Sequence, residues 1–195
     1  MSQLVLTSDT LIGTPATGNI EYNGQFFGTD SNASRAQLQR ITQGTSVAST
    51  SGTSISFTSL PSWIKRITVM LNAVSSGGSS IYLVQLGTGG TATTTSYLTS
   101  ATQLGSGAVT SFYTTGFGIS HSASNQVWSG HFTLTNISGN IWVGSGTSAS
   151  QTGSALTSTS AGNITLGGVL DMVRFTTVNG TDLFNAGSVN IMYEG

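Results

Sequence analysis

The chain has 195 residues, enough for one domain with a substantial core preceded by a smaller arm. Only 6% of the residues are charged, whereas about 25% is usual in soluble domains. The chain has a formal net charge of -1 and only five cations, so it cannot form a positive surface that attracts nucleic acid or an anionic membrane. Both are therefore excluded as partners. It has no cysteine, which excludes disulfides and thiolate metal sites.

Residues 1–45 are the predicted N-terminal arm and connector. The arm lacks the basic start and long apolar run of a secretory signal, so we expect a protein made in the cytoplasm. Residues 19–28, NIEYNGQFFG, predict a small hairpin that turns at Asn23 and Gly24. Residues 31–41, SNASRAQLQRI, are compatible with a short helix. We expect the arm to pack on the main domain, a neighbouring subunit or another protein; the alternative is a partly disordered tail.

Residues 46–195 are the predicted main domain. Runs rich in Val, Ile, Thr and aromatic residues alternate with Gly, Ser and Asn clusters, a pattern typical of an all-β sandwich or barrel. The expected strands are residues 53–59, 65–74, 80–87, 95–104, 111–120, 126–136, 140–147, 169–178 and 188–194. Asn179 and Gly180 indicate a tight turn. The predicted fold class is therefore all-β: a jelly-roll-like antiparallel β-sandwich preceded by an extended arm with a small hairpin.

The segment KRITVMLNA begins with two adjacent cations, Lys65 and Arg66, which a strand must point to opposite faces. Alternation assigns Ile67, Val69, Leu71 and Ala73 to the core face, with Lys65 at its rim, where the ammonium group reaches water past the end of the strand. Arg66 then lies on the outer face, beside Met70.

The segment MVRFTTV near the C-terminus has a similar pattern, with Met172 and Arg174 on its outer face. Arginine and methionine are enriched at subunit interfaces. We therefore predict that these two strands are neighbours and that Arg66, Met70, Met172 and Arg174 form a subunit interface. The alternative is that these are ordinary exposed strand residues.

The sequence contains few carboxylates and histidines that could act in catalysis. Asp171, Asp182 and Glu194 are the only carboxylates after residue 30, and we interpret them as ion-pair partners for the nearby cations rather than as a glycosidase pair. His121 and His131 lack metal-ligand spacing, and His131 falls on a polar strand face. We expect no enzyme, no catalytic residues, no cofactor and no metal.

The aromatic residues leave two interpretations open. Exposed tryptophans can stack on sugar rings, and a surface rich in hydroxyl groups, from 31 serines and 31 threonines, suits contact with glycans. However, Trp128 and Trp142 fall at alternating apolar positions, so we expect them in the core or in a seam between subunits. The sequence assigns no receptor-binding residues, which are unknown.

Two segments, TSISFTSLPSWIKRITVMLNAVSSGGSS and VRFTTVNGTDLFNAGSVNIMYEG, together with the intervening LVQLGTGG, resemble a β-rich C-terminal domain of bacteriophage tail fibre proteins. The resemblance covers about residues 50–195, and the arm segment TPATGNIEYNG is similar to segments that precede such domains. The resemblance implies a structural protein of the phage virion, a homotrimer with other virion proteins as partners.

Two functions fit this resemblance. One is a short trimeric tail fibre of adhesion type that binds a host surface glycan. The other is a trimeric capsid decoration (cement) protein that stabilises the head. The short chain without a repetitive shaft favours the cement protein, whereas the resemblance to tail fibre proteins favours the fibre. A hydrolase of host polysaccharide is a third, weaker alternative. The near-zero net charge is also compatible with stable association of copies.

Overall fold

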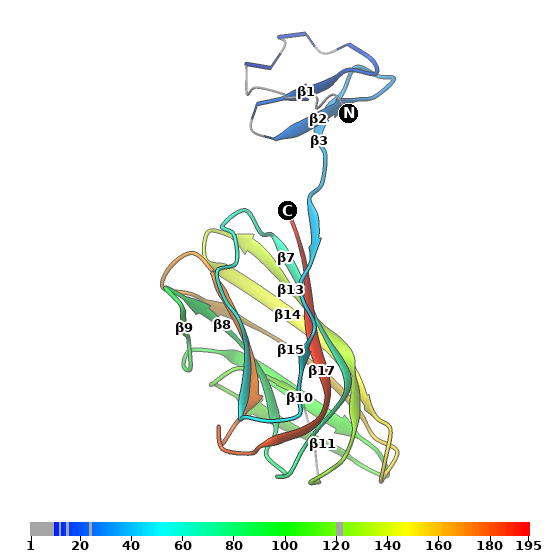
Figure 1. Ribbon diagram of the computed structural model, residues 1–195, viewed down its shortest axis with the longest axis vertical. Coiled ribbons are helices and arrows are strands. Elements are labelled where there is room, and N and C mark those ends of the chain that lie inside the picture. Colours follow the sequence, from blue (N-terminus) through cyan, green and yellow to red (C-terminus); the bar gives the residue numbers. More distant parts are fainter. Residues whose placement is uncertain (1–9, 12, 15, 24, 120–122) are drawn as a thin grey trace. The chain divides into compact units, whose positions relative to one another are not determined.

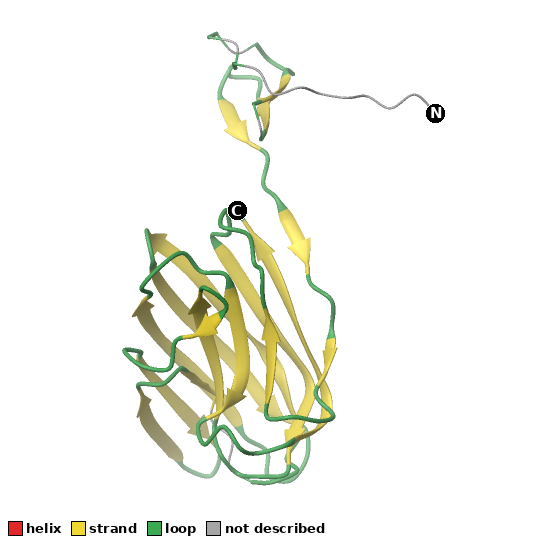
Figure 2. Ribbon diagram, turned by 60° about the vertical axis from the view of Figure 1, so that its left-hand side comes forward, coloured by secondary structure: helices red, strands yellow, loops and turns green. Residues whose placement is uncertain are grey.

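The computed structural model describes residues 10–11, 13–14, 16–23, 25–119 and 123–195, and it divides into two compact units, Met1–Arg40 and Ile41–Gly195 (Figures 1 and 2). Across these described residues the secondary structure is strands and turns without a helix, and the strands pair antiparallel. The predicted all-β fold class is confirmed. The part of the chain that the structure describes contains no helix of the length and hydropathy that a bilayer span requires.

The smaller unit is built on a three-stranded sheet in the order β1 (Ile20–Tyr22), β2 (Phe26–Thr29), β3 (Arg35–Gln37). Strands β1 and β2 form the predicted hairpin, although Gly24 of its turn lies outside the described residues. The predicted helix at residues 31–41 is wrong, because β3 occupies its middle and pairs with β2. The short polar segment gains more hydrogen bonds from a sheet edge than from one isolated helical turn.

The larger unit contains a nine-stranded sheet. Eight strands follow one another in the order β11 (Ala108–Tyr113), β10 (Leu98–Leu104), β15 (Thr157–Thr165), β14 (Ile141–Ser150), β13 (Trp128–Ser138), β7 (Arg66–Ser76), β17 (Phe184–Glu194) and β4 (Ile41–Gln43). The ninth strand, β5 (Val47–Ala48), also pairs with β17. Because β4 belongs to this sheet, the larger unit starts at residue 41 rather than at the predicted residue 46.

A five-stranded sheet forms the second layer of the larger unit (Figure 2). Its strands are β12 (Phe117–Ile119), β8 (Tyr82–Thr88), β16 (Met172–Thr177), β6 (Ser54–Phe57) and β9 (Thr91–Ala92). Apolar side chains from both sheets form one core, which includes Trp128 and Trp142 as predicted. The larger unit is therefore a sandwich of two antiparallel sheets.

One predicted strand is split in the structure, and one long observed strand was not predicted. The expected strand at residues 111–120 is split, because β11 ends at residue 113 in one sheet and β12 begins at residue 117 in the other. Strand β15 was not predicted, because its sequence, TSTSAGNIT, consists mainly of small polar residues. Pairing with β14 and β10 on its two sides places it in the middle of the sheet.

Strand β7 confirms most of the predicted alternation. Ile67, Val69 and Leu71 are buried, and Lys65 and Arg66 are exposed. Ala73 does not follow the pattern, because it has a positive φ of 51° at a bulge and Val74 takes the core position instead.

The partner strand of this bulge requires glycine. Gly187 of β17 has a φ of 88°, and a Cβ atom there would lie 2.3 Å from the carbonyl oxygen of Ala73. A side chain at position 187 would thus face both a left-handed backbone conformation and a collision with the backbone of β7.

Two buried tyrosines anchor the core. Tyr97 accepts a hydrogen bond from the backbone amide of Leu86 at 2.7 Å, and its ring packs edge-on against Phe117. Tyr82 contacts the ring of Phe175. Burial, the largest cause in both cases, raises the pKa of Tyr97 and raises the pKa of Tyr82 to about 12, because the phenolate form loses its solvation.

Candidate functional site

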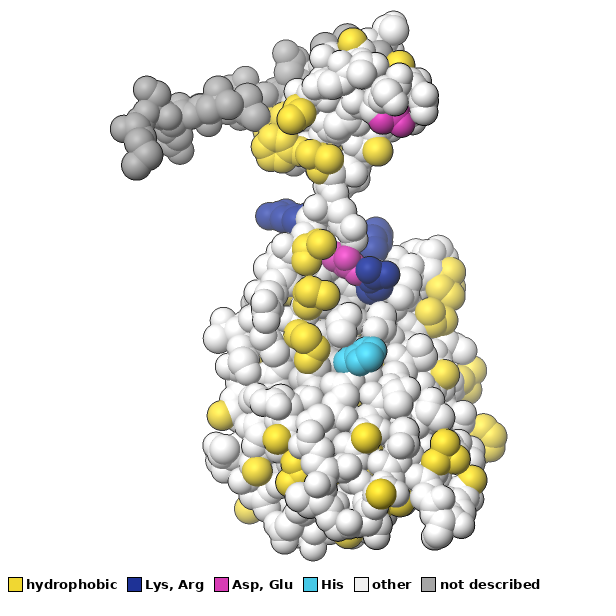
Figure 3. All heavy atoms as spheres, turned by 90° about the vertical axis from the view of Figure 1, so that its right-hand side faces the viewer, with side chains coloured by type: hydrophobic (Ala, Val, Ile, Leu, Met, Phe, Trp, Pro, Cys, Tyr) yellow, Lys and Arg dark blue, Asp and Glu magenta, His cyan; other side chains and the backbone are white. Residues whose placement is uncertain are grey.

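The face of the nine-stranded sheet that points away from the core is the candidate site, and we call it the outer face. Residues that pair across strands place seven outward side chains in one row: Asn190, Met70, His131, Thr147, Thr159, Thr102 and Thr110. Figure 3 shows this face as a largely uncharged polar surface, with a line of apolar side chains beside the cyan histidine and further apolar side chains scattered over the face. Such a flat polar face suits contact with another surface rather than enclosure of a small molecule.

Arg66 and Glu194 are the only charged residues within the nine strands of this sheet. They lie opposite each other on β7 and β17, and the Arg66 guanidinium donates a hydrogen bond to the Glu194 carboxylate. The Glu194 side chain is 8% exposed, whereas that of Arg66 is 53% exposed. The two charges cancel, so an uncharged surface can pack on the outer face without burying a net charge.

One margin of the outer face carries large exposed apolar residues. On β10, Leu98 and Leu104 point outward, while Thr99 and Ala101 point into the sandwich and are buried. Phe112 of β11 lies on the same outer face and is 88% exposed. We call Leu98, Leu104 and Phe112 the β10–β11 patch. Phe112 is a diagonal neighbour of Leu98, whereas Thr102 lies between Leu104 and these two residues on the same face.

The opposite margin carries a second apolar group. Ile41 of β4, Met192 of β17 and Met70 of β7 share the outer face, and register places them at successive diagonal positions across the three strands. Ile41 is exposed, and the two methionines are partly buried. We call these three residues the β17 patch; diagonal neighbours at this spacing are close enough for long side chains to touch.

The four residues predicted as an interface do not gather on one surface. Arg66 and Met70 lie on the outer face, but Met172 and Arg174 belong to β16 in the five-stranded sheet, so the prediction that the two strands are neighbours is wrong. Met172 is buried, and the Arg174 Nε donates a 2.7 Å hydrogen bond to the side chain of Gln85. Similar local sequences, Arg-Ile-Thr and Arg-Phe-Thr, occur in different sheets because strand neighbours are chosen by the packing of the whole chain.

Sequence reasoning did not identify the β10–β11 patch. Within residues 98–104 one side of the strand reads Leu, Ser, Thr, Leu and the other reads Thr, Ala, Gln, so the alternation does not decide which side is buried. The side of β10 that faces the core carries Thr99, a polar residue. Its hydroxyl donates hydrogen bonds to the carbonyl oxygens of Tyr113 and Gly116 at 3.0 and 2.9 Å, so it is satisfied inside the sandwich. A small polar residue with such partners fits the interior.

The carboxylates confirm one of the predicted ion-pair roles. Glu194 pairs with Arg66, but Asp171 accepts hydrogen bonds from the backbone amide of Gly90, and Asp182 accepts one from the amide of Ser80. In the predicted tight turn, Gly180 has a φ of 68°, and Asn179 donates to Asp182 at 2.6 Å. These aspartates therefore hold loops in place.

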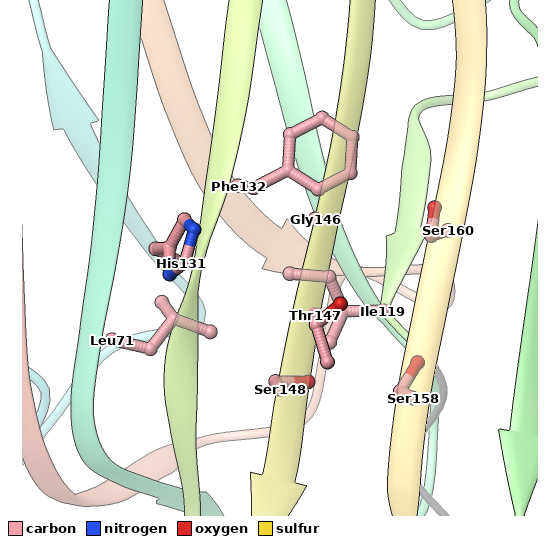
Figure 4. Close-up of a pocket in the computed structure, with 9 residues that line it drawn as sticks. All are labelled: Leu71, Ile119, His131, Phe132, Gly146, Thr147, Ser148, Ser158 and Ser160. Carbon is pink, nitrogen blue, oxygen red and sulfur yellow. The ribbon is translucent and has the colours of Figure 1, made fainter.

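His131 is the histidine that the structure describes, since His121 lies outside the described residues. His131 is exposed, as predicted, and Figure 4 shows it with the buried Ser148, Ser158 and Ser160 around a small cavity. The cavity has no space for a water molecule. The pairing register places His131 outward and Ser148 inward, so the two do not form a nucleophile and base pair.

The small inward residues near this cavity serve packing. A Cβ atom at Gly146 would lie 2.7 Å from the Phe132 ring, and one at Gly144 would lie 2.5 Å from it. Glycine at these two positions of β14 lets the buried ring lie flat against the sheet. Among the described residues, no three His, Asp or Glu side chains are grouped closely enough to hold a metal ion.

Comparisons of the chain with protein families, with curated proteins and with solved structures found no match.

Proposed function

We propose that this chain is a structural protein of a tailed bacteriophage virion: a trimeric surface protein of the tail-fibre type that binds the host surface. The observation that carries the proposal is the outer face of the nine-stranded sheet, which combines a self-neutralised ion pair with two apolar patches at opposite margins. The sequence resemblance to tail fibre domains supplies the virion context.

Two different patches on one protomer suit a closed ring of copies. In a cyclic trimer each protomer contacts one neighbour through one surface and the other neighbour through a different surface. We infer that the β10–β11 patch of one copy packs on the β17 patch of the next. Phenylalanine, leucine and methionine are residue types that such contacts bury.

The smaller unit supports a role in attachment to other virion proteins. One side of its sheet carries Glu21 and Arg35, which form a 2.6 Å ion pair. The other side carries Ile20, Phe26 and Leu38, all exposed within the described part of this unit. A three-stranded sheet with an uncovered apolar face gains stability from a protein that covers it.

The same apolar side favours the second candidate, a capsid decoration protein. In that case the smaller unit clamps a neighbouring capsid subunit, and the sandwich stabilises the head from outside. Both candidates share the trimer and differ in the location of the protein in the particle.

The test is electron microscopy of the virion of the phage that encodes this chain, combined with native mass spectrometry of the purified protein. Trimers located at the tail support the fibre. Trimers at three-fold positions of the capsid support the cement protein and contradict the fibre. A monomer, or a protein missing from the particle, contradicts the proposal as a whole.

A further inference from the structure

A pocket of about 190 Å³ lies at one end of the sandwich, apart from the outer face. Its walls come from the connection between β6 and β7, the turn between β13 and β14, and the connection between β15 and β16. We propose that this pocket binds one acidic sugar unit, a uronic acid, of a bacterial surface polysaccharide. The inference names the ligand class for the host-binding role and rests on the proposed function.

The floor of the pocket is apolar. Ile64, Trp142 and Leu170 line it, and each is at most 4% exposed. A pyranose ring has a face of C–H groups that packs on such a surface, while its hydroxyls point to the sides. Because these three residues are almost fully covered, the apolar contact area for a ring comes mainly from two other lining residues, Val169, which is 58% exposed, and the partly buried Pro61.

Three polar side chains at the rim are available for a ligand. Lys65 and Ser62 are exposed and Asn140 is partly buried. Within the described part of the chain, none of these three side chains has a hydrogen-bond or ion-pair partner. One cation, one amide and one hydroxyl match one carboxylate and the hydroxyls of a sugar.

The nearby carboxylates are engaged elsewhere, which leaves the charge of Lys65 uncompensated. Glu194 binds Arg66, and Asp171 accepts from the amide of Gly90. Among the described residues that line the pocket, Lys65 is the only charged one. The pocket therefore favours an anion over a neutral sugar, and a single ammonium group matches a singly charged carboxylate.

The walls are held by backbone hydrogen bonds. The amide of Leu60 donates to the Asp171 carbonyl at 2.9 Å, and the amide of Leu166 donates to the Asn140 carbonyl at 3.0 Å. The Asn136 side-chain amide donates to the carbonyl oxygen of Gly139 at 2.9 Å. Each bond ties one wall to another element or closes the turn, so the pocket is formed before a ligand arrives.

The size limits the ligand to one ring. Pockets for drug-sized molecules measure about 300–1,000 Å³, and this one is smaller. A nucleotide exceeds the space and carries more negative charge than one lysine neutralises. A uronic acid within a polysaccharide presents one ring and one carboxylate, which the pocket accommodates while the rest of the polymer stays in solvent.

The test is saturation-transfer difference NMR on the full-length protein with sodium D-glucuronate and, as a neutral ligand of the same ring, D-glucose. We expect ring C–H signals from glucuronate with a millimolar dissociation constant, and signals at least several-fold weaker from glucose. Lys65→Gln should weaken glucuronate binding about tenfold, the effect of losing one charge-assisted contact. Arg174→Gln, which removes a cation from the five-stranded sheet, should bind as the unaltered protein does.

Three results would each overturn the inference: equal signals from the two sugars, no signal from glucuronate, or unchanged binding of glucuronate by a folded Lys65→Gln variant. A circular dichroism spectrum and melting curve establish that each variant is folded. These outcomes are independent of the proposed function, because a protein that forms trimers in the virion but binds no glucuronate refutes the pocket alone. A protein that binds glucuronate but is missing from the virion refutes the proposed function alone.

Discussion

The strongest test of the proposed trimer is the substitution Phe112→Ser in the β10–β11 patch. An aromatic side chain covers about 200 Å², and Phe112 is 88% exposed in the protomer. A neighbour that covers it removes roughly 175 Å² of apolar surface from water, worth about 4 kcal/mol at 25 cal/mol per Å². Incomplete coverage lowers this to about 2–4 kcal/mol, which raises the dissociation constant of the contact roughly 30- to 700-fold.

The assay is sedimentation velocity over a range of protein concentrations. Phe112→Ser should dissociate at concentrations at which the unaltered protein is a trimer, while its protomer melts normally because the side chain has little intramolecular burial. Leu183→Ser is the matched control, since Leu183 is 61% exposed but lies in the connection between β16 and β17, outside the sheet. If Phe112→Ser and Leu183→Ser sediment alike, the inferred contact is wrong.

A double-mutant cycle tests the pairing of the two patches. Met192→Ser alone should also weaken the trimer, because Met192 lies in the β17 patch. If the patches meet, combining it with Phe112→Ser costs less than the sum of the single changes, since both residues stabilise the same contact. Strict additivity would place the two residues in separate contacts.

Three further predictions concern the fold. Stability should fall as the pH rises from about 10 to 12, because unfolded tyrosine ionises near 10 whereas the pKa of Tyr82 is raised to about 12. Tyr82 accounts for at most about 3 kcal/mol of this loss, and Tyr97, whose pKa burial also raises, adds to it; urea titrations measure the loss, and a flat profile would contradict it. Gly187→Ala should destabilise the protein by about 2 kcal/mol or more through backbone strain and collision, and an unchanged melting temperature would show that the bulge relaxes. Arg66→Ala should cost about 1–2 kcal/mol by removing the Arg66 partner of the shielded Glu194 carboxylate; adding Glu194→Gln should recover part of this loss, and failure to do so would assign the loss to packing.

Local sequence carried enough information to predict most strands. The alternation of Ile67, Val69 and Leu71 with polar residues indicates a half-buried strand without reference to any other part of the chain. The apolar positions of Trp128 and Trp142 likewise predict the core that both occupy. Strand β15 gave no such signal, because its small polar residues have no side chain that requires burial.

The candidate site depends on information that no single segment contains. Leu98 and Leu104 are the largest apolar residues of β10, yet they point outward because hydrogen-bond pairing with β15 and β11 sets the register of β10. The end pocket likewise brings Lys65, Asn140 and Leu170 together from three connections far apart in the chain.

The sequence by itself determined that this protein is a nearly uncharged all-β chain with a small hairpin arm, since composition and two-residue periodicity are local properties. Only the tertiary structure decided that β7 and β16 lie in different sheets, and which side of β10 points outward. The physical reason is that partner choice and register arise from hydrogen bonds and packing between strands distant in sequence, and a one-residue change of register exchanges the buried face for the exposed one.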